Sequence, residues 1–139
     1  MSGWLPRHAY IPGETPRHPE DLFEPIKQSV HRDLAADQLF ETEAWSVGLH
    51  CFQNGYFWEA HELWEPVWLA FPPNAGERIW VQSAIQLANA GLKARMGRDS
   101  AKARLLQHAK ELHVEAQLRG ASGPSEVKWQ QLLQQICAL

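Results

Sequence analysis

Apolar residues recur at three- and four-residue steps through most of the chain, which is the period of an α-helix. In residues 56–71 the apolar side chains fall on one face of such a helix. No stretch alternates between apolar and polar residues for long enough to predict a strand. The pattern predicts an all-α fold, a single compact bundle of about five to six helices. These helices are expected near residues 19–28 and over residues 37–54, 56–71, 75–96, 99–119 and 125–138.

The helix predicted over residues 75–96 is apolar around most of its circumference. A helix of this kind is usually surrounded by others, so we expect it at the centre of the bundle. Its exception is a narrow polar stripe in steps of four, three and four residues: Gln82, Gln86, Asn89 and Lys93. Amides that are buried in a central helix need hydrogen-bond partners. We therefore expect the stripe to face polar groups on a neighbouring helix.

Proline is concentrated near the amino terminus, where five of the nine prolines lie within the first 25 residues. This density excludes a long helix there, because each proline removes a backbone donor and restricts the preceding residue. We therefore divide the chain into an extended arm, residues 1–19, and a single helical-bundle domain, residues 20–139. Because the arm carries Trp4 and Tyr10, we expect it to lie over the helical body as a strap; a loose tail is the alternative.

Composition limits the classes of partner. The chain has 139 residues, 45% hydrophobic and 21% charged, which is ordinary for one globular domain. Its net charge of −3 argues against nucleic acid and anionic membranes as partners. No apolar run is long enough for a membrane-spanning helix. Cys51 and Cys137 fit reduced thiols in a cytoplasmic protein. A small ligand and a second copy of the chain, in a homo-oligomer, both remain possible partners.

Charge is distributed unevenly along the chain. Residues 1–65 contain eleven acidic and four basic residues, a net charge of −7. Residues 93–119 contain three acidic and seven basic residues, a net charge of +4. The basic segment is either a solvated helix face or a docking site for an anionic partner.

Residues 54–68 are the most informative segment and contain three of the seven tryptophans. His61 and Glu65 are four residues apart, so they are neighbours on one stripe of the helix. Trp58 and Trp68 flank this stripe. We expect Glu65 to be mostly buried, because Trp58 and Trp68 flank it. A buried carboxylate needs a partner, so we expect a hydrogen bond to His61 or to the amide stripe, the residues Gln82, Gln86 and Asn89.

These positions predict one polar cluster in a Trp-rich cleft. It can be a hydrogen-bonded network that fixes helix register, a pocket for a small ligand or metal, or a catalytic site. His61 and Glu65 are the candidate metal ligands, although the zinc-protease pattern has a second histidine where Glu65 stands. No catalytic residue is assigned and no cofactor is implied. The members of the cluster are His61, Glu62, Glu65, Gln82, Gln86, Asn89, Trp58 and Trp68.

Three functions are consistent with the cluster. The first is a binding or scaffold module, and the second is a metal-assisted hydrolase or oxidase that uses the same residues. The third is a protein-interaction module that uses exposed tryptophan surface or the basic helix. Because only the second of these functions is enzymatic, the sequence leaves open whether the protein is an enzyme. The core is predicted separately, from the apolar faces: Trp64, Trp68, Trp80, Ile85, Leu87, Ala88 and Leu105.

The segment around His61 resembles the bacterial and archaeal family called domain of unknown function 309. The family motif Phe-Asn-x-Gly-x-Tyr-Phe-Glu-Ala-His-Glu-x-x-Glu-x-x-Trp is similar to residues 52–68. A second family block, Gly-Leu-Ile-Gln-Leu-Ala-Ala-Ala, is similar to residues 83–90. The resemblance implies an all-helical fold with a central helix. It implies no particular activity, because none is established for the family.

Overall fold

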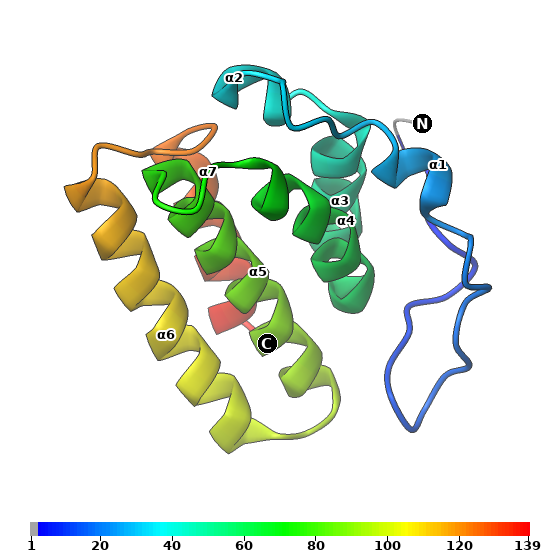
Figure 1. Cartoon of the computed structure of the whole chain (residues 1–139). Helices are drawn as coiled ribbons and strands as arrows, with labels where there is room; N and C mark the ends of the chain where they lie inside the picture. Colours follow the sequence, from blue (N-terminus) through cyan, green and yellow to red (C-terminus); the bar gives the residue numbers. More distant parts are fainter. Residues whose placement is uncertain (1–2) are drawn as a thin grey trace.

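The computed structural model describes residues 3–139, so the first two residues of the predicted arm lie outside it. Within this range all the regular secondary structure is helical (Figure 1), which confirms the all-α prediction. None of the helices in residues 3–139 is long and apolar enough to cross a membrane. In chain order they are α1 (Glu24–Lys27), α2 (Ala36–Leu39), α3 (Glu43–Gln53), α4 (Phe57–Ala70), α5 (Gly76–Arg95), α6 (Asp99–Leu118) and α7 (Glu126–Cys137).

The described residues form seven helices rather than five to six, because the helix predicted over residues 37–54 is divided into α2 and α3. The division is at Thr42, whose backbone is extended and whose hydroxyl accepts a hydrogen bond from the Trp45 N–H (3.3 Å). Threonine in this position is a helix N-cap, so α3 starts afresh there. Asp37, the first residue of the predicted helix, lies inside α2.

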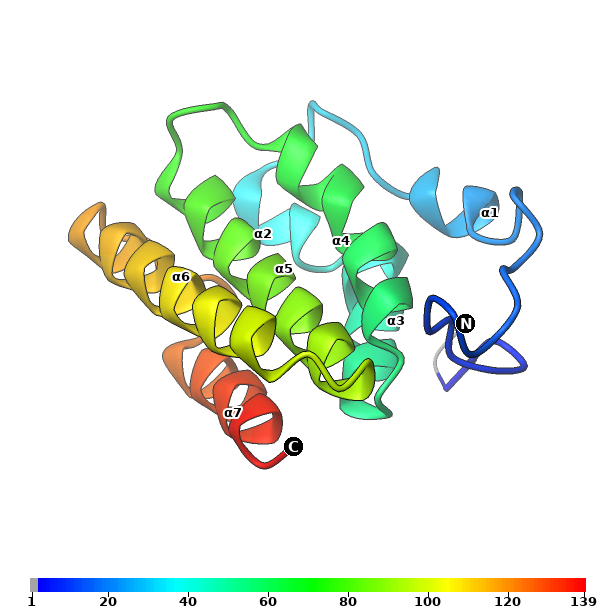
Figure 2. The same ribbon diagram turned by 90° about the horizontal axis from the view of Figure 1, so that it is seen from below.

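Helix α5 occupies the predicted central position. It lies between α4 and α6 and also contacts α7, as the view from below in Figure 2 shows. Trp129 of α7 donates its indole N–H to the Ser83 hydroxyl of α5 (2.6 Å), so a buried hydrogen bond supplements the apolar packing. Helix α3 packs against α4. The side of α4 that faces α5 is therefore where the two predicted polar stripes can meet.

Aromatic side chains fill much of the core. Trp64 stacks on Trp45, with ring centroids 4.7 Å apart and 20° between the planes. Two predicted core residues, Trp68 and Leu105, are only half-buried. Trp68 lies at the edge of a surface pocket, and Leu105 belongs to α6, which packs mainly against α5. The other predicted core residues are buried, which confirms their assignment: Trp64, Trp80, Ile85, Leu87 and Ala88.

Residues 3–19 contain no helix and run beside α1 and α4 (Figure 1). Trp4 packs edge-on against Phe23, with ring centroids 6.1 Å apart. Tyr10 packs in the same way against Trp58 of α4, at 5.1 Å. These contacts bring the arm next to the helix that carries the predicted polar cluster. The boundary between arm and domain at residue 19 stays a prediction.

Candidate functional site

Helix α4 has one face in the core and another that carries ionisable side chains. Leu63 and Trp64 are buried, whereas the side chains of His61, Glu62 and Glu65 are partly exposed. The helix continues through Pro66, although the nitrogen of this residue carries no hydrogen and cannot donate a hydrogen bond to the carbonyl four residues earlier. The ionisable residues thus share little more than one turn of a continuous helix.

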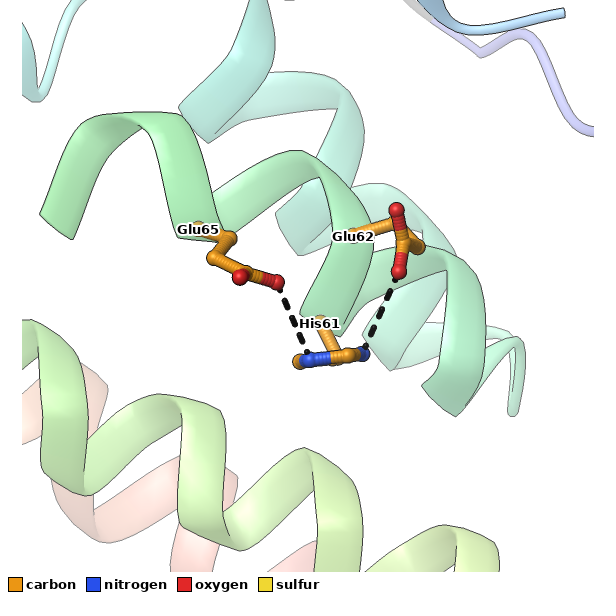
Figure 3. Close-up of side chains that lie close together, drawn as sticks. All are labelled: His61, Glu62 and Glu65. Carbon is orange, nitrogen blue, oxygen red and sulfur yellow. Dashed lines mark ion pairs between the residues drawn. The ribbon is translucent and has the colours of Figure 1, made fainter. Parts of the chain in front are cut away.

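The carboxylates of Glu62 and Glu65 lie on either side of the His61 imidazole (Figure 3). His61 Nε2 lies 3.2 Å from Glu65 Oε2, and His61 Nδ1 lies 3.9 Å from Glu62 Oε1. Glu62 also accepts a hydrogen bond from the Lys27 ammonium group of α1, at 3.2 Å. One ligand atom from each of the three side chains can be chosen so that all lie within 4.8 Å of one another. The arrangement therefore has the donor types and the spacing of a candidate metal site.

A pocket of about 190 Å³ opens between α4 and α5 beside this cluster. Helix α4 contributes His61, Glu65 and Trp68, and α5 contributes the amide stripe Gln82, Gln86 and Asn89 together with Ile85. Six of the eight predicted cluster residues therefore line one pocket; we call it the α4–α5 pocket. Glu62 and Trp58 instead line a neighbouring pocket that the arm helps to form.

The burial predicted for Glu65 is wrong. Its side chain is 45% exposed, and the ion pair with His61 is its only polar side-chain contact within residues 3–139. Within residues 3–139 the amide stripe does not bond to Glu65, and one of its amides, Asn89, donates its N–H to Gln86 Oε1 at 3.2 Å. Flanking tryptophans do not enclose this carboxylate, since Trp58 lines a different pocket and Trp68 is itself half-buried. Glu65 therefore lies at the open edge of the α4–α5 pocket, where it is available to a ligand.

Because the pair is exposed, Glu65→Gln is expected to change the free energy of unfolding by less than about 1 kcal/mol. Solvent screens the attraction between His61 and Glu65, and the amide keeps the shape of the side chain. Urea denaturation of the wild type and the variant, without added metal, measures this difference. A loss of several kcal/mol would show that Glu65 is a structural group.

Glu59 is a buried acidic residue that the sequence analysis did not select. Its side chain is fully buried, and its Oε2 atom accepts a hydrogen bond from the Tyr10 backbone N–H (2.6 Å). The same oxygen lies 2.6 Å from His18 Nε2, and the His18 side chain is only 5% exposed. The other oxygen, Oε1, has no hydrogen-bond partner in the described part of the chain. Glu59 lies four residues before Leu63, on the same stripe of the helix, but Leu63 was not among the predicted core residues, so the sequence analysis had no signal for the burial of Glu59.

The buried Glu59 affects a neighbouring thiol. Burial, and secondarily the negative charge of Glu59, raise the pKa of the Cys51 thiol from 9.0 to about 12. Cys137 is exposed near the carboxyl end of the chain. Because the thiolate is the reactive species, the two cysteines should differ strongly in reactivity.

We expect a disulfide reagent to modify Cys137 rapidly in the native protein and Cys51 only after unfolding. The raised pKa keeps Cys51 in the thiol form even at mildly alkaline pH, and burial denies the reagent access. Absorbance of the released thiol, followed over time with and without denaturant, gives the two rates. Fast native labelling of the Cys137→Ser variant would contradict the placement of Cys51.

A larger pocket, of about 660 Å³, lies elsewhere, where α4 turns into α5. Its wall includes Leu69, Phe71 and Arg78, and it contains none of the eight predicted cluster residues. Size alone would favour it as a binding site. The α4–α5 pocket is the better candidate for specific chemistry, because it combines an imidazole, a carboxylate and three amides.

Comparison with known proteins places the α4–α5 pocket inside a recognised domain. The model of the family described as "Domain of unknown function (DUF309)" matches residues 45–105, which include α4, α5 and most of α3. No curated protein and no solved structure is significantly similar to the chain. The match confirms, over residues 45–105, the resemblance to the family called domain of unknown function 309 that the sequence motifs indicate.

Proposed function

We propose that this protein is a helical binding module whose ligand in the α4–α5 pocket is a divalent transition-metal ion. The observation that carries the proposal is the distance of 3.2 Å between His61 Nε2 and Glu65 Oε2. Two ligands that are each about 2.0–2.2 Å from a tetrahedral metal ion lie roughly 3.3–3.6 Å apart. The pair is therefore close to the separation at which both atoms bind one ion.

The donor set favours a transition metal over magnesium or calcium. Imidazole nitrogen suits zinc, iron and nickel, whereas magnesium and calcium prefer oxygen ligands throughout. On the opposite wall, the amide oxygen of Gln82 is available as a further ligand or as an acceptor for metal-bound water, whereas that of Gln86 already accepts a hydrogen bond from Asn89. Glu62 is close enough to join, and its Oε2 atom is bonded to Lys27 while its Oε1 atom faces His61.

Isothermal titration of the metal-free protein with zinc chloride, manganese chloride and magnesium chloride tests the proposal. All samples carry Cys137→Ser, so that the exposed thiol does not bind zinc. We expect about one zinc ion per chain and weaker binding of manganese and magnesium. Loss of outer-shell groups weakens metal sites about 10–100-fold, so removal of the direct ligand in His61→Ala should weaken zinc binding by more than about 100-fold.

His108→Ala is the matched control, because His108 is exposed on α6 and is not part of any cluster of metal-ligating side chains found in residues 3–139. It should bind zinc as the parent does. Glu65→Gln should weaken zinc binding without the loss of stability that a misfolded variant would show. Zinc binding that is unchanged in both His61→Ala and Glu65→Gln contradicts the proposal.

A cytoplasmic location is part of the proposal. Its support is that Cys51 and Cys137 are both free thiols, which fits a reducing compartment. Fractionation of cells that produce the full chain, followed by immunodetection, tests it; recovery from a membrane or extracellular fraction contradicts it.

A further inference from the structure

The arm lines another pocket, of about 390 Å³, next to the segment that leads into α1. We call it the arm pocket. Its charged and titratable wall consists of Arg7, Arg17, His8 and His18, and its apolar wall includes Trp4 and Leu22. None of the residues between 3 and 139 that line it is acidic. Its size is within the range of about 300–1,000 Å³ that is typical of small-molecule sites.

The arm pocket is basic, although the part of the chain that forms it has a negative net charge. Residues 1–65 have a net charge of −7 and only four basic residues, yet two of these, Arg7 and Arg17, line this pocket. Both are exposed, and neither forms an ion pair with an acidic residue in the part of the chain that the structure describes. Two guanidinium groups without a carboxylate partner make a favourable place for an anion.

The two histidines give the arm pocket a fixed wall. Their rings lie side by side, with centroids 4.7 Å apart. His18 is held by the buried carboxylate of Glu59 (2.6 Å), and His8 Nε2 is held by the backbone carbonyl of Pro16 (2.7 Å). Because these contacts exist without a ligand, little ordering of the wall is required on binding.

We propose that the arm pocket binds a small organic anion, with a carboxylate or phosphate head between Arg7 and Arg17 and an apolar body against Trp4 and Leu22. Arginine recognises both kinds of head through paired N–H donors. The apolar wall requires a body that an inorganic ion lacks. The neighbouring pocket shares Arg17, His18 and Pro19 with the arm pocket, but its wall also includes Glu20 and Glu62, which disfavour an anion there. The head group is therefore placed on the side of Arg17 that faces Trp4 and Leu22. This proposal does not depend on metal binding at the α4–α5 pocket.

Titration with four probes tests the proposal: 1-naphthoate, 1-naphthyl phosphate, the neutral 1-naphthamide, and inorganic phosphate. EDTA is present throughout, so that the outcome is independent of the metal site. We expect one of the two naphthyl anions to bind at about one per chain, and at least about tenfold more tightly than both the amide and inorganic phosphate. Which anion binds more tightly identifies the preferred head group.

Arg7→Gln and Arg17→Gln should each weaken this binding at least about threefold, and the double variant more strongly. Arg104→Gln is the matched control, since Arg104 is an exposed arginine on α6, and it should bind as the wild type does. The changes are at exposed positions, and thermal denaturation verifies that each variant is folded. Equal binding of the amide, equal binding of inorganic phosphate, no binding of either naphthyl anion, or indifference to both arginine substitutions would overturn the proposal.

Discussion

Replacement of His18 with alanine is expected to destabilise the protein by about 3–5 kcal/mol. The His18 side chain is the partner of the Glu59 carboxylate, which is fully buried and lies 2.6 Å from it. Removal of one member of a buried ion pair leaves the other charge without compensation in a medium that solvates it poorly. Urea denaturation, monitored by tryptophan fluorescence, measures the change in the free energy of unfolding.

Two controls separate the buried charge from a general effect of histidine loss. His108→Ala removes an exposed histidine and should change stability by no more than about 0.5 kcal/mol. The double variant His18→Ala/Glu59→Gln removes the uncompensated charge, so it should be more stable than His18→Ala alone. If His18→Ala costs less than about 1 kcal/mol, the arm does not hold Glu59 in the way the contacts indicate.

Trp64→Ala is expected to cost about 3–5 kcal/mol, the usual effect of truncating a buried tryptophan. Trp64 is fully buried and stacks on both Trp45 and Phe52, with centroid separations of 4.7 and 5.6 Å. Truncation leaves a cavity where α3 packs against α4, and neighbouring rings cannot fill it without leaving their own contacts. The shift of the urea midpoint, at an unchanged slope, measures the loss.

The hydrogen bonds of the two indole N–H groups predict a difference in stability between Trp64→Phe and Trp80→Phe. Trp64 donates to the carbonyl of Trp45 at 3.2 Å, whereas the Trp80 N–H is buried without a partner in the described chain. Trp64→Phe should therefore cost about 0.5–1.5 kcal/mol more than Trp80→Phe, the contribution of one hydrogen bond. Leu118→Ala, at a position that is 83% exposed, is the control for a change of little effect. Equal stability of Trp64→Ala and wild type would contradict the placement of α4 in the core.

Much of the fold could be predicted from the sequence, because its signals are local. The three-to-four-residue spacing of apolar residues locates the long helices, and the apolar circumference of α5 gives its central position. The same period predicts that His61 and the Gln82–Gln86–Asn89 stripe can line one pocket, which they do. The break between α2 and α3 was missed, although the hydroxyl of Thr42 was a visible capping signal.

Contacts between segments that are distant in the sequence could not be predicted from it. The pairing of Glu59 with His18 and with the Tyr10 backbone joins residues 41 and 49 positions apart, and no helical period predicts it. The exposure of Glu65 depends on how closely α5 approaches α4 at that turn, which is a property of packing between helices. The same holds for the arm pocket, because only the path of an irregular segment brings Arg7 and Arg17 to the wall of one pocket.

The most direct test of the metal-binding proposal is a crystal structure of the full chain grown with zinc and recorded at the zinc absorption edge. We expect an anomalous peak in the α4–α5 pocket, about 2.0–2.2 Å from His61 Nε2 and from a Glu65 carboxylate oxygen. Further ligands should come from water or from the α5 amides. A zinc peak bound only elsewhere, with His61 and Glu65 still paired directly to each other, would contradict the account.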